Sequence, residues 1–205
     1  MRQMGLAFAF AVLFLVGCSG KHSLVNPEWK NAPDSYTVLV SRPFVGNPDD
    51  VADDLPEYTS NFEEWFSAEI ATALEKRTEK KPSVEVELDE NFNLVPLKFG
   101  KEAFLQTPIP NLDRISGLHG VVISIHPIKF KRKTEKHNSA SGTTVDHWLV
   151  VNGTYSIVSA DEEKILAYGL CYGISSFKFA MTKGDWENVV DDLAKTVIQD
   201  TPLEK

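Results

Sequence analysis

The sequence predicts an α+β domain in which a single mixed sheet of about five strands packs against two or three helices. The expected order of elements is β-α-β-(α)-β-β-β-α. Two amphipathic stripes at helical spacing predict the main helices, and five runs rich in β-branched and aromatic residues predict the strands. The last strands follow one another without a helix between them, which favours antiparallel hairpins. This domain is expected to occupy residues 35–205 as one unit.

An acidic segment separates the first strand from the first helix. Residues 36–40 predict a strand that Pro43 and Gly46 bring to an end. Residues 47–57 then carry five carboxylates, which belong to Asp49, Asp50, Asp53, Asp54 and Glu57. A calcium-binding EF-hand loop needs acids at alternate positions and a central glycine. The segment lacks both features, so we interpret it as a solvated acidic loop.

The first helix has the clearest local signal in the chain. Ser60 and Glu63 have the spacing of a capping box, in which both side chains pair with free backbone amides. An apolar stripe then recurs every four residues, at Phe62, Phe66, Ile70 and Leu74. Pro82 stops the helix, and residues 83–88 alternate in type as a half-buried strand does.

The middle of the chain is less regular. Residues 89–110 are expected to form irregular structure over an edge of the core, with a short helix near 101–106. Prolines at 108 and 110 interrupt any regular element there. Residues 112–120 predict a short helix that ends at Gly120.

Strands dominate the next part of the sequence. Residues 121–125 are apolar enough for a central strand. Pro127 weakens strand pairing, and residues 128–133 continue with a basic face. A Ser/Gly/Asn-rich loop is expected at 134–144, followed by a long strand at 146–158.

A hairpin and a helix close the chain. A turn at 160–164 leads into a partner strand at 165–175. Thr182 or Asp185 is expected to cap the last helix, and Pro202 follows its end. The apolar stripe of this helix consists of Trp186, Val189, Val190, Leu193, Val197 and Ile198.

The N-terminus has the features of a secretory leader. Arg2 precedes an apolar run from Leu6 to Val16. A transmembrane helix needs a longer apolar stretch than this run provides. The run ends in Leu-Val-Gly-Cys and resembles the bacterial lipobox. The resemblance implies that residues 1–17 are removed and that Cys18 is acylated, which anchors the chain in a lipid bilayer. Residues 18–34 are polar and predict a lipidated tether.

By resemblance to enterobacterial lipoproteins, the residue after the acylated cysteine guides sorting. Ser19 stands there in place of the aspartate that retains proteins in the inner membrane. The expected location is therefore the periplasmic face of the outer membrane. Acylation of Cys18 would also leave Cys171 without a disulfide partner, and we interpret Cys171 as a small buried apolar residue.

Charge limits the kinds of partner. The net charge is −8, and it becomes −9 when Arg2 leaves with the leader. Such a chain is a poor candidate for nucleic-acid binding, which needs clustered cations. One basic cluster stands out, and it consists of Lys129, Lys131, Arg132, Lys133 and Lys136. Together with the acidic segment 47–57, it predicts either a dipolar surface that steers a binding partner or an edge strand protected by lysines.

Two kinds of function follow from the side-chain chemistry. The sequence contains no nucleophile elbow and no glycine-rich phosphate loop, so a non-catalytic protein without a cofactor is expected. The alternative is a metal-binding protein or metal-dependent enzyme that uses His126, His137 and His147, with Asp146 as a further ligand. Their spacing matches no compact metal-ligand motif.

The order of elements behind the lipobox resembles a group of bacterial envelope lipoproteins. These share an α/β domain with the N-terminal domain of TolB, the curli-secretion lipoprotein and the lipoprotein activators of penicillin-binding proteins. The matching parts are the strand 36–40, the helix 62–74, the unit 112–125 and the closing part from 148 to 198. Members of this group act as pores, activators or assembly adaptors, so the resemblance does not choose among these roles. Residues 129–144 are too basic and too polar for the membrane-spanning hairpins of a pore. Together with the anchor, the tether and the lack of a catalytic motif, the resemblance leads us to expect a protein that binds an envelope protein partner, in cell-wall or outer-membrane assembly. It carries over no functional residue.

Overall fold

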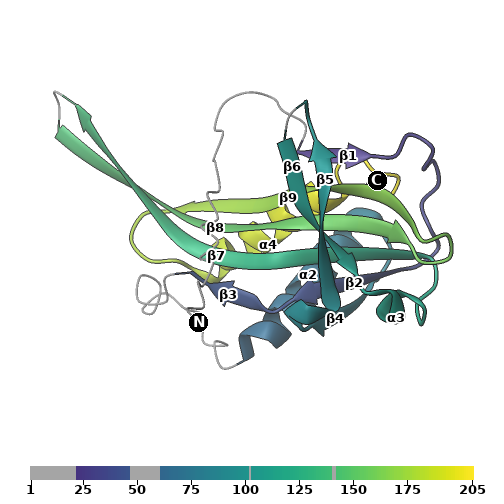
Figure 1. Cartoon of the computed structure of the whole chain (residues 1–205). Helices are drawn as coiled ribbons and strands as arrows, with labels where there is room; N and C mark the ends of the chain where they lie inside the picture. Colours follow the sequence, from purple (N-terminus) through teal and green to yellow (C-terminus); the bar gives the residue numbers. More distant parts are fainter. Residues whose placement is uncertain (1–21, 47–60, 102, 140–141) are drawn as a thin grey trace, which may run out of the picture.

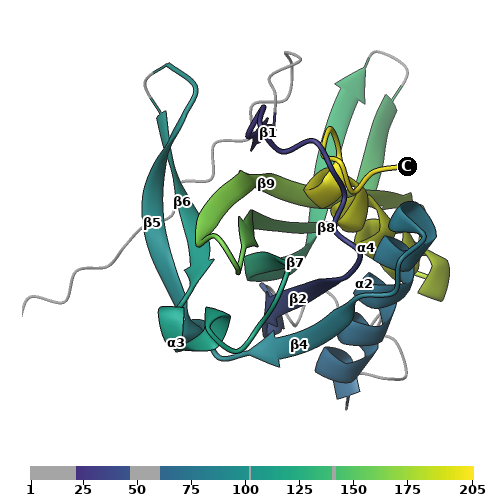
Figure 2. The same cartoon turned by 90° about the vertical axis from the view of Figure 1, so that its right-hand side faces the viewer.

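The computed structural model describes residues 22–46, 61–101, 103–139 and 142–205, which form three layers (Figures 1 and 2). Two helices cover one face of a seven-stranded sheet, and a two-stranded hairpin crosses part of the other face. The large sheet contains β1 (Ser23–Val25), β2 (Tyr36–Ser41), β3 (Pro43–Val45), β4 (Ser83–Glu87), β7 (Val121–Ser139), β8 (Gly142–Ser159) and β9 (Lys164–Phe177). The remaining elements are α2 (Phe62–Thr78), η3 (Asp89–Asn91), β5 (Phe92–Phe99), β6 (Ala103–Pro110), α3 (Leu112–Ile115) and α4 (Lys183–Ile198).

The α+β class is confirmed, but the sheet is larger than the five strands expected. Its order is β1-β9-β8-β7-β2-β4, with β3 also paired to β7. β2 runs parallel to β4 and β7, β3 also runs parallel to β7, and the other pairs are antiparallel, so the sheet is mixed. The two short strands β1 and β3 account for the difference, because strands this short do not show an alternating pattern.

The main core lies between the sheet and the two long helices. The predicted stripes of both helices are confirmed: Phe66, Ile70 and Leu74 of α2 and Trp186 of α4 are fully buried. Phe130 of β7 packs between them, with its ring centroid 5.9 Å from that of Phe66 and 5.5 Å from that of Trp186. Such aromatic pairs stabilise a core beyond the area that they bury.

The two helices begin differently. Thr182 caps α4, which was one of the two expectations. The pair forms a capping box, because the Thr182 hydroxyl accepts from the Asp185 amide and the Asp185 carboxylate accepts from the Thr182 amide. Helix α2 starts after Asn61, which makes no side-chain cap. Ser60 and the acidic segment 47–57 lie outside the described residues.

A second, smaller core lies on the other face of the sheet. There Leu39, Val122 and Val158 pack against Phe92 of β5 and Ile115 of α3. The expectation of irregular structure at 89–110, with a short helix near 101–106, is wrong, because β5 and β6 form a regular hairpin. The prolines at 108 and 110 misled the interpretation, since proline usually breaks a strand, and the hairpin contains a third proline at 96.

The register explains how the hairpin tolerates these prolines. Pro96 pairs with Gln106, Pro108 with Leu94, and Pro110 with Phe92, so all three occupy pairs of the same type. In an antiparallel ladder every second pair is not hydrogen-bonded, and its backbone N–H groups point outward. A proline in such a pair removes no ladder hydrogen bond.

The long hairpin β7–β8 replaces the loop expected at 134–144. Both strands continue, with Thr134 paired to His147 and Ser139 paired to Gly142. β9 ends opposite His147, so the last part of the hairpin extends past the sheet as a two-stranded arm (Figure 1). Threonine and valine residues favour strands even where the composition is otherwise polar.

The tether expected at 18–34 is shorter than the sequence suggested. Ser23–Val25 form β1, which pairs with β9 in the register Leu24 to Tyr168. Asn26 continues this contact, because its amide donates to the carbonyl of Leu166, and Trp29 packs against the main core. The chain therefore joins the folded domain at residue 23, only five positions after Cys18.

Close packing of α4 on β9 generates the first prediction. A Cβ atom at Gly173 would overlap the Val189 carbonyl oxygen, which belongs to the backbone of α4. We expect Gly173→Ala to lower the free energy of unfolding by at least about 2 kcal/mol, because helix and sheet must separate. Urea denaturation followed by circular dichroism measures this change.

Gly117 provides the control, since a Cβ there meets nothing within 4 Å. Gly117→Ala should change the free energy of unfolding by less than about 1 kcal/mol. Equal effects of the two substitutions would contradict the packing argument.

Candidate functional site

The sheet carries one broad surface that neither the helices nor the β5–β6 hairpin cover. In Figure 1 it faces the viewer, between the hairpin and the arm. We call it the open face and define it by the side chains of Phe44, Lys129, Lys131, Lys133, Trp148, Val150, Asn152, Tyr172, Ile174 and Ser176. Ile174 is 45% exposed and Phe44 is 46% exposed, while Val150 is buried among its neighbours. The face therefore presents apolar groups to solvent.

The register arranges the open face in rows across three strands. Lys131 of β7 lies opposite Val150 of β8, which lies opposite Ile174 of β9. The neighbouring rows are Lys129–Asn152–Tyr172 and Lys133–Trp148–Ser176. Directly opposed side chains in a sheet contact one another. The face therefore combines a row of lysines with apolar and aromatic neighbours.

A β-bulge places the lysines on this face. Before it, Ile123 and Ile125 point into the main core; after it, Ile128 and Phe130 do so. The register shift lies between His126 and Lys129. Because strand side chains alternate, the odd positions turn outward only after the bulge. Without this shift, the lysines would be directed at the helices.

Aromatic rings hold two of these lysines. The Lys129 ammonium lies 5.6 Å from the ring centroid of Phe44, and the Lys133 ammonium lies 5.5 Å from that of Trp148. These distances are typical of cation–π contacts. Lys133 also forms an ion pair with Glu135 at 2.5 Å. The aromatic side chains of this face were not found from the sequence, although the alternation around 148 and 172 could have indicated them.

Lys131, in the middle of the row, is partly buried and lies between two like charges. The pKa of Lys131 is lowered, first by partial burial and then by the charges of Lys129 and Lys133. Alternate residues of a strand are about 6.6 Å apart, so the three ammonium groups repel one another. A bound anion would relieve this repulsion.

The five basic residues singled out in the sequence do not form one site. Arg132 and Lys136 alternate with the lysines of the open face and point to the opposite side of the strand. The Arg132 guanidinium lies 5.1 Å from the ring centroid of Phe177, and Lys136 lies on the arm. The expected partner site is thus reduced to Lys129, Lys131 and Lys133 with their aromatic neighbours.

The three histidines of the metal hypothesis lie apart. His126 and His137 occupy distant positions on the same strand, and the rise per strand residue separates them by about 35 Å. His147 pairs with Thr134, and so lies on the face opposite to His137. His137 contacts Asp146 at 3.3 Å. Within the described ranges, no three His, Cys, Asp or Glu side chains gather as a metal site, so the structure does not support this hypothesis.

Cys171 and His126 are buried and pack within the fold. Cys171 is 1% exposed, and burial raises the pKa of its thiol, which confirms the interpretation as a buried apolar residue. His126 stacks on Phe92 with ring centroids 5.1 Å apart. Burial lowers the pKa of His126, while the nearby Asp89 acts in the opposite direction.

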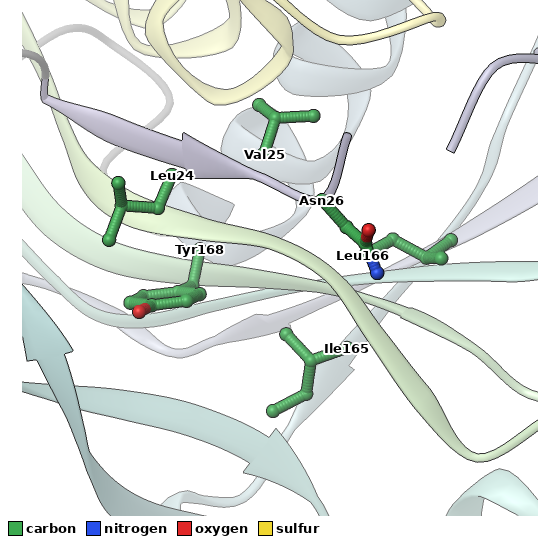
Figure 3. A pocket seen from close by; sticks show the side chains of 6 residues that line it. All are labelled: Leu24, Val25, Asn26, Ile165, Leu166 and Tyr168. Atoms are coloured by element: carbon green, nitrogen blue, oxygen red, sulfur yellow. The ribbon is translucent and has the colours of Figure 1, made fainter. Parts of the chain in front are cut away.

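A small pocket lies between β1 and β9 (Figure 3). Its volume is about 160 Å³, and its lining consists of Leu24, Val25, Asn26, Ile165, Leu166 and Tyr168. This is below the range of about 300–1,000 Å³ that is typical of small-molecule sites. The lining is mainly apolar and holds no ionisable group except the Tyr168 hydroxyl, which donates to the Lys98 carbonyl.

Comparison with known proteins gives structural neighbours only. No family model and no curated protein matches the sequence. The PelC dodecamer from Paraburkholderia phytofirmans is 11% identical, with 89% of this chain and 94% of that chain covered and a TM-score of 0.39. A neuraminyllactose-binding hemagglutinin homolog from Helicobacter pylori is 15% identical (83% and 85% covered, TM-score 0.35). A minor lipoprotein from Acinetobacter baumannii is 12% identical (79% and 89% covered, TM-score 0.32).

Similarity at this level transfers no function to the chain. The structure itself adds one observation about membranes: across the described ranges, no helix is both long and apolar enough to cross a bilayer.

The setting of His126 predicts a pH dependence of stability. The unfolded chain takes up a proton at this site near pH 6.5, whereas the folded chain does so only at lower pH. Between these values the unfolded state binds more protons, so the free energy of unfolding should rise with pH. His126→Phe keeps the ring on Phe92 and removes the proton, so urea unfolding from pH 5 to 7 should show a shallower slope.

His119 serves as the control, because its side chain is 92% exposed. His119→Phe should keep the slope of the original protein. An unchanged slope in His126→Phe would show that other groups cause the pH dependence.

Proposed function

We propose that this chain is a non-catalytic lipoprotein of the cell envelope that binds an acidic partner protein on its open face. The anchor is an acylated Cys18, and the location is the periplasmic face of the outer membrane, where the partner would act in cell-wall or outer-membrane assembly. Kinship with the TolB-like envelope domains belongs to the same proposal. The lysine row beside exposed apolar side chains supports it most strongly.

The composition of the open face fits a protein partner. Protein interfaces combine an apolar, aromatic centre with charged groups that set orientation and speed of association. Here Ile174 lies at the centre beside the buried Val150, and Trp148 and Tyr172 flank them. The row of lysines lies along one side of this centre. The face therefore offers both apolar area and charge complementarity to an acidic surface.

The overall charge favours selectivity for such a partner. The mature chain carries −9, which is the −8 of the full sequence without Arg2, so an acidic protein is repelled by most of its surface. The lysine row is a local exception on an otherwise anionic molecule, and such asymmetry orients a partner before contact. The same acidity argues against nucleic acid, which needs an extended cationic surface.

The partner site can be tested by charge reversal in intact cells. A photoreactive side chain at Tyr172 should crosslink one defined envelope protein. A variant that combines Lys129→Glu, Lys131→Glu and Lys133→Glu should form at least tenfold less crosslinked product. The reason is that the open face would then repel an acidic partner instead of attracting it. Quantitative immunoblotting of the product gives the measurement.

A second triple variant controls for the change of net charge. It combines Lys76→Glu, Lys136→Glu and Lys183→Glu, three positions away from the open face. The side chains of Lys76 and Lys183 are 74% and 70% exposed. This variant should keep most of the crosslinked product. Equal losses in both variants would assign the effect to net charge and would reject the site.

The anchor can be tested separately. Cys18→Ser should release the protein from the membrane fraction, since no acyl chain can be attached. Mass spectrometry of the mature original protein should show a diacylglycerol-modified N-terminal cysteine. An unmodified N-terminus, or a Cys18→Ser chain that stays with the membrane to the same extent, would contradict the lipoprotein assignment.

A further inference from the structure

The β5–β6 hairpin exposes apolar side chains that the fold does not use. Phe104 is 70% exposed and Leu94 is 42% exposed. Phe104 lies directly opposite Lys98 in the register, and Lys101 follows in the turn. Residues 92–110 contain three charged residues, which are these two lysines and Glu102. One side of the hairpin therefore presents a phenylalanine and a leucine accompanied by lysines.

The hairpin is hydrogen-bonded to β9, and β9 pairs with β1, the strand through which the chain enters the domain. Leu24 of β1 pairs with Tyr168 of β9, and the Tyr168 hydroxyl donates to the Lys98 carbonyl of β5 at 2.6 Å. In Figures 1 and 2, the end of β5 and the start of β6 lie near the same edge of the sheet as β1, the edge formed with β9. The exposed side chains are therefore close to the N-terminal entry.

The short connection restricts where a bilayer can lie. Only the segment from Cys18 to Ser23 joins the acylated residue to β1. An extended chain spans at most about 3.5 Å per residue, which gives about 17 Å for this segment. An acyl group on Cys18 therefore enters the bilayer within this distance of β1. The hairpin, which contacts β9 through Tyr168, then lies near enough to the bilayer to reach its surface.

We propose that the β5–β6 hairpin is a second membrane contact, which places Phe104 and Leu94 in the interfacial region of the bilayer beside the acylated N-terminus. This inference rests on the proposed lipidation of Cys18. Aromatic side chains are favoured at the headgroup level, and lysines there contact lipid phosphates. Two contacts fix the orientation of the domain, whereas an acyl anchor alone leaves it free to rotate.

A fluorescent probe on the full lipidated protein tests the contact. Phe104→Cys is labelled with an environment-sensitive dye after reconstitution into vesicles of phosphatidylethanolamine and phosphatidylglycerol. Acylation occupies Cys18, and Cys171 is buried, so the dye attaches at residue 104. We expect a blue-shifted emission, quenching by spin-labelled lipids, and at least threefold slower quenching by aqueous iodide than for the control.

Phe179→Cys provides the control, because Phe179 is 91% exposed and follows the far end of β9. The strand carries the chain from Tyr168 to Phe177, a separation of about 30 Å at the rise of an extended strand. A dye at residue 179 should stay accessible to iodide. Equal accessibility at residues 104 and 179 would overturn the proposal.

Flotation of the vesicles distinguishes a failure of the hairpin contact from a failure of the lipid anchor. If the protein floats with the vesicles and the dye at residue 104 remains in water, lipidation holds and the hairpin contact is rejected. If the protein does not float, the anchor itself is rejected and the hairpin contact, which depends on it, is rejected with it. A label at Leu94→Cys should give the same direction of change as residue 104, with a smaller shift.

Discussion

Strands β7 and β8 are longer than the helices and the hairpin that pack on them, and most features of the molecule depend on this difference in length. β7 has 19 residues, and a strand of that size extends about 60 Å. Helix α2 has 17 residues, but the smaller rise of a helix limits it to about 25 Å. Each helix therefore covers less than half of the strand length on one face, and the β5–β6 hairpin crosses only part of the other. The uncovered remainder is the open face and the arm.

The bulge between His126 and Lys129 decides what chemistry the uncovered remainder carries. In a strand with unbroken alternation, the side chains of Ile125 and Phe130 would point to opposite faces, so only one of them could lie in the main core. The bulge shifts the alternation by one residue, so the apolar residues before it and after it all point into the main core. Bulges commonly re-aim side chains in this way. The row of lysines next to apolar residues is thus a consequence of register.

Periodicity explains how much of this could be predicted from the sequence. The apolar stripes of α2 and α4 and the patterns of the central strands repeat often enough to be recognised. The β5–β6 hairpin was missed because its prolines look like breaks, and the arm was missed because its composition looks like a loop. The basic cluster was found, but Arg132 was assigned to the same surface as Lys131, since composition alone does not show which way each side chain points.

The β9 edge of the sheet favours recognition on a face. An unpaired edge strand invites another strand to add to it, but β1 covers β9 at residues 167–169. Further along, the Tyr172 amide donates to the Thr196 hydroxyl of α4, and the same hydroxyl lies 3.2 Å from the Tyr172 carbonyl oxygen. The Tyr172 amide, which a partner strand would need as a donor at this position, is therefore occupied. At these positions of β9, a partner therefore contacts the side chains of the open face rather than pairing with the backbone.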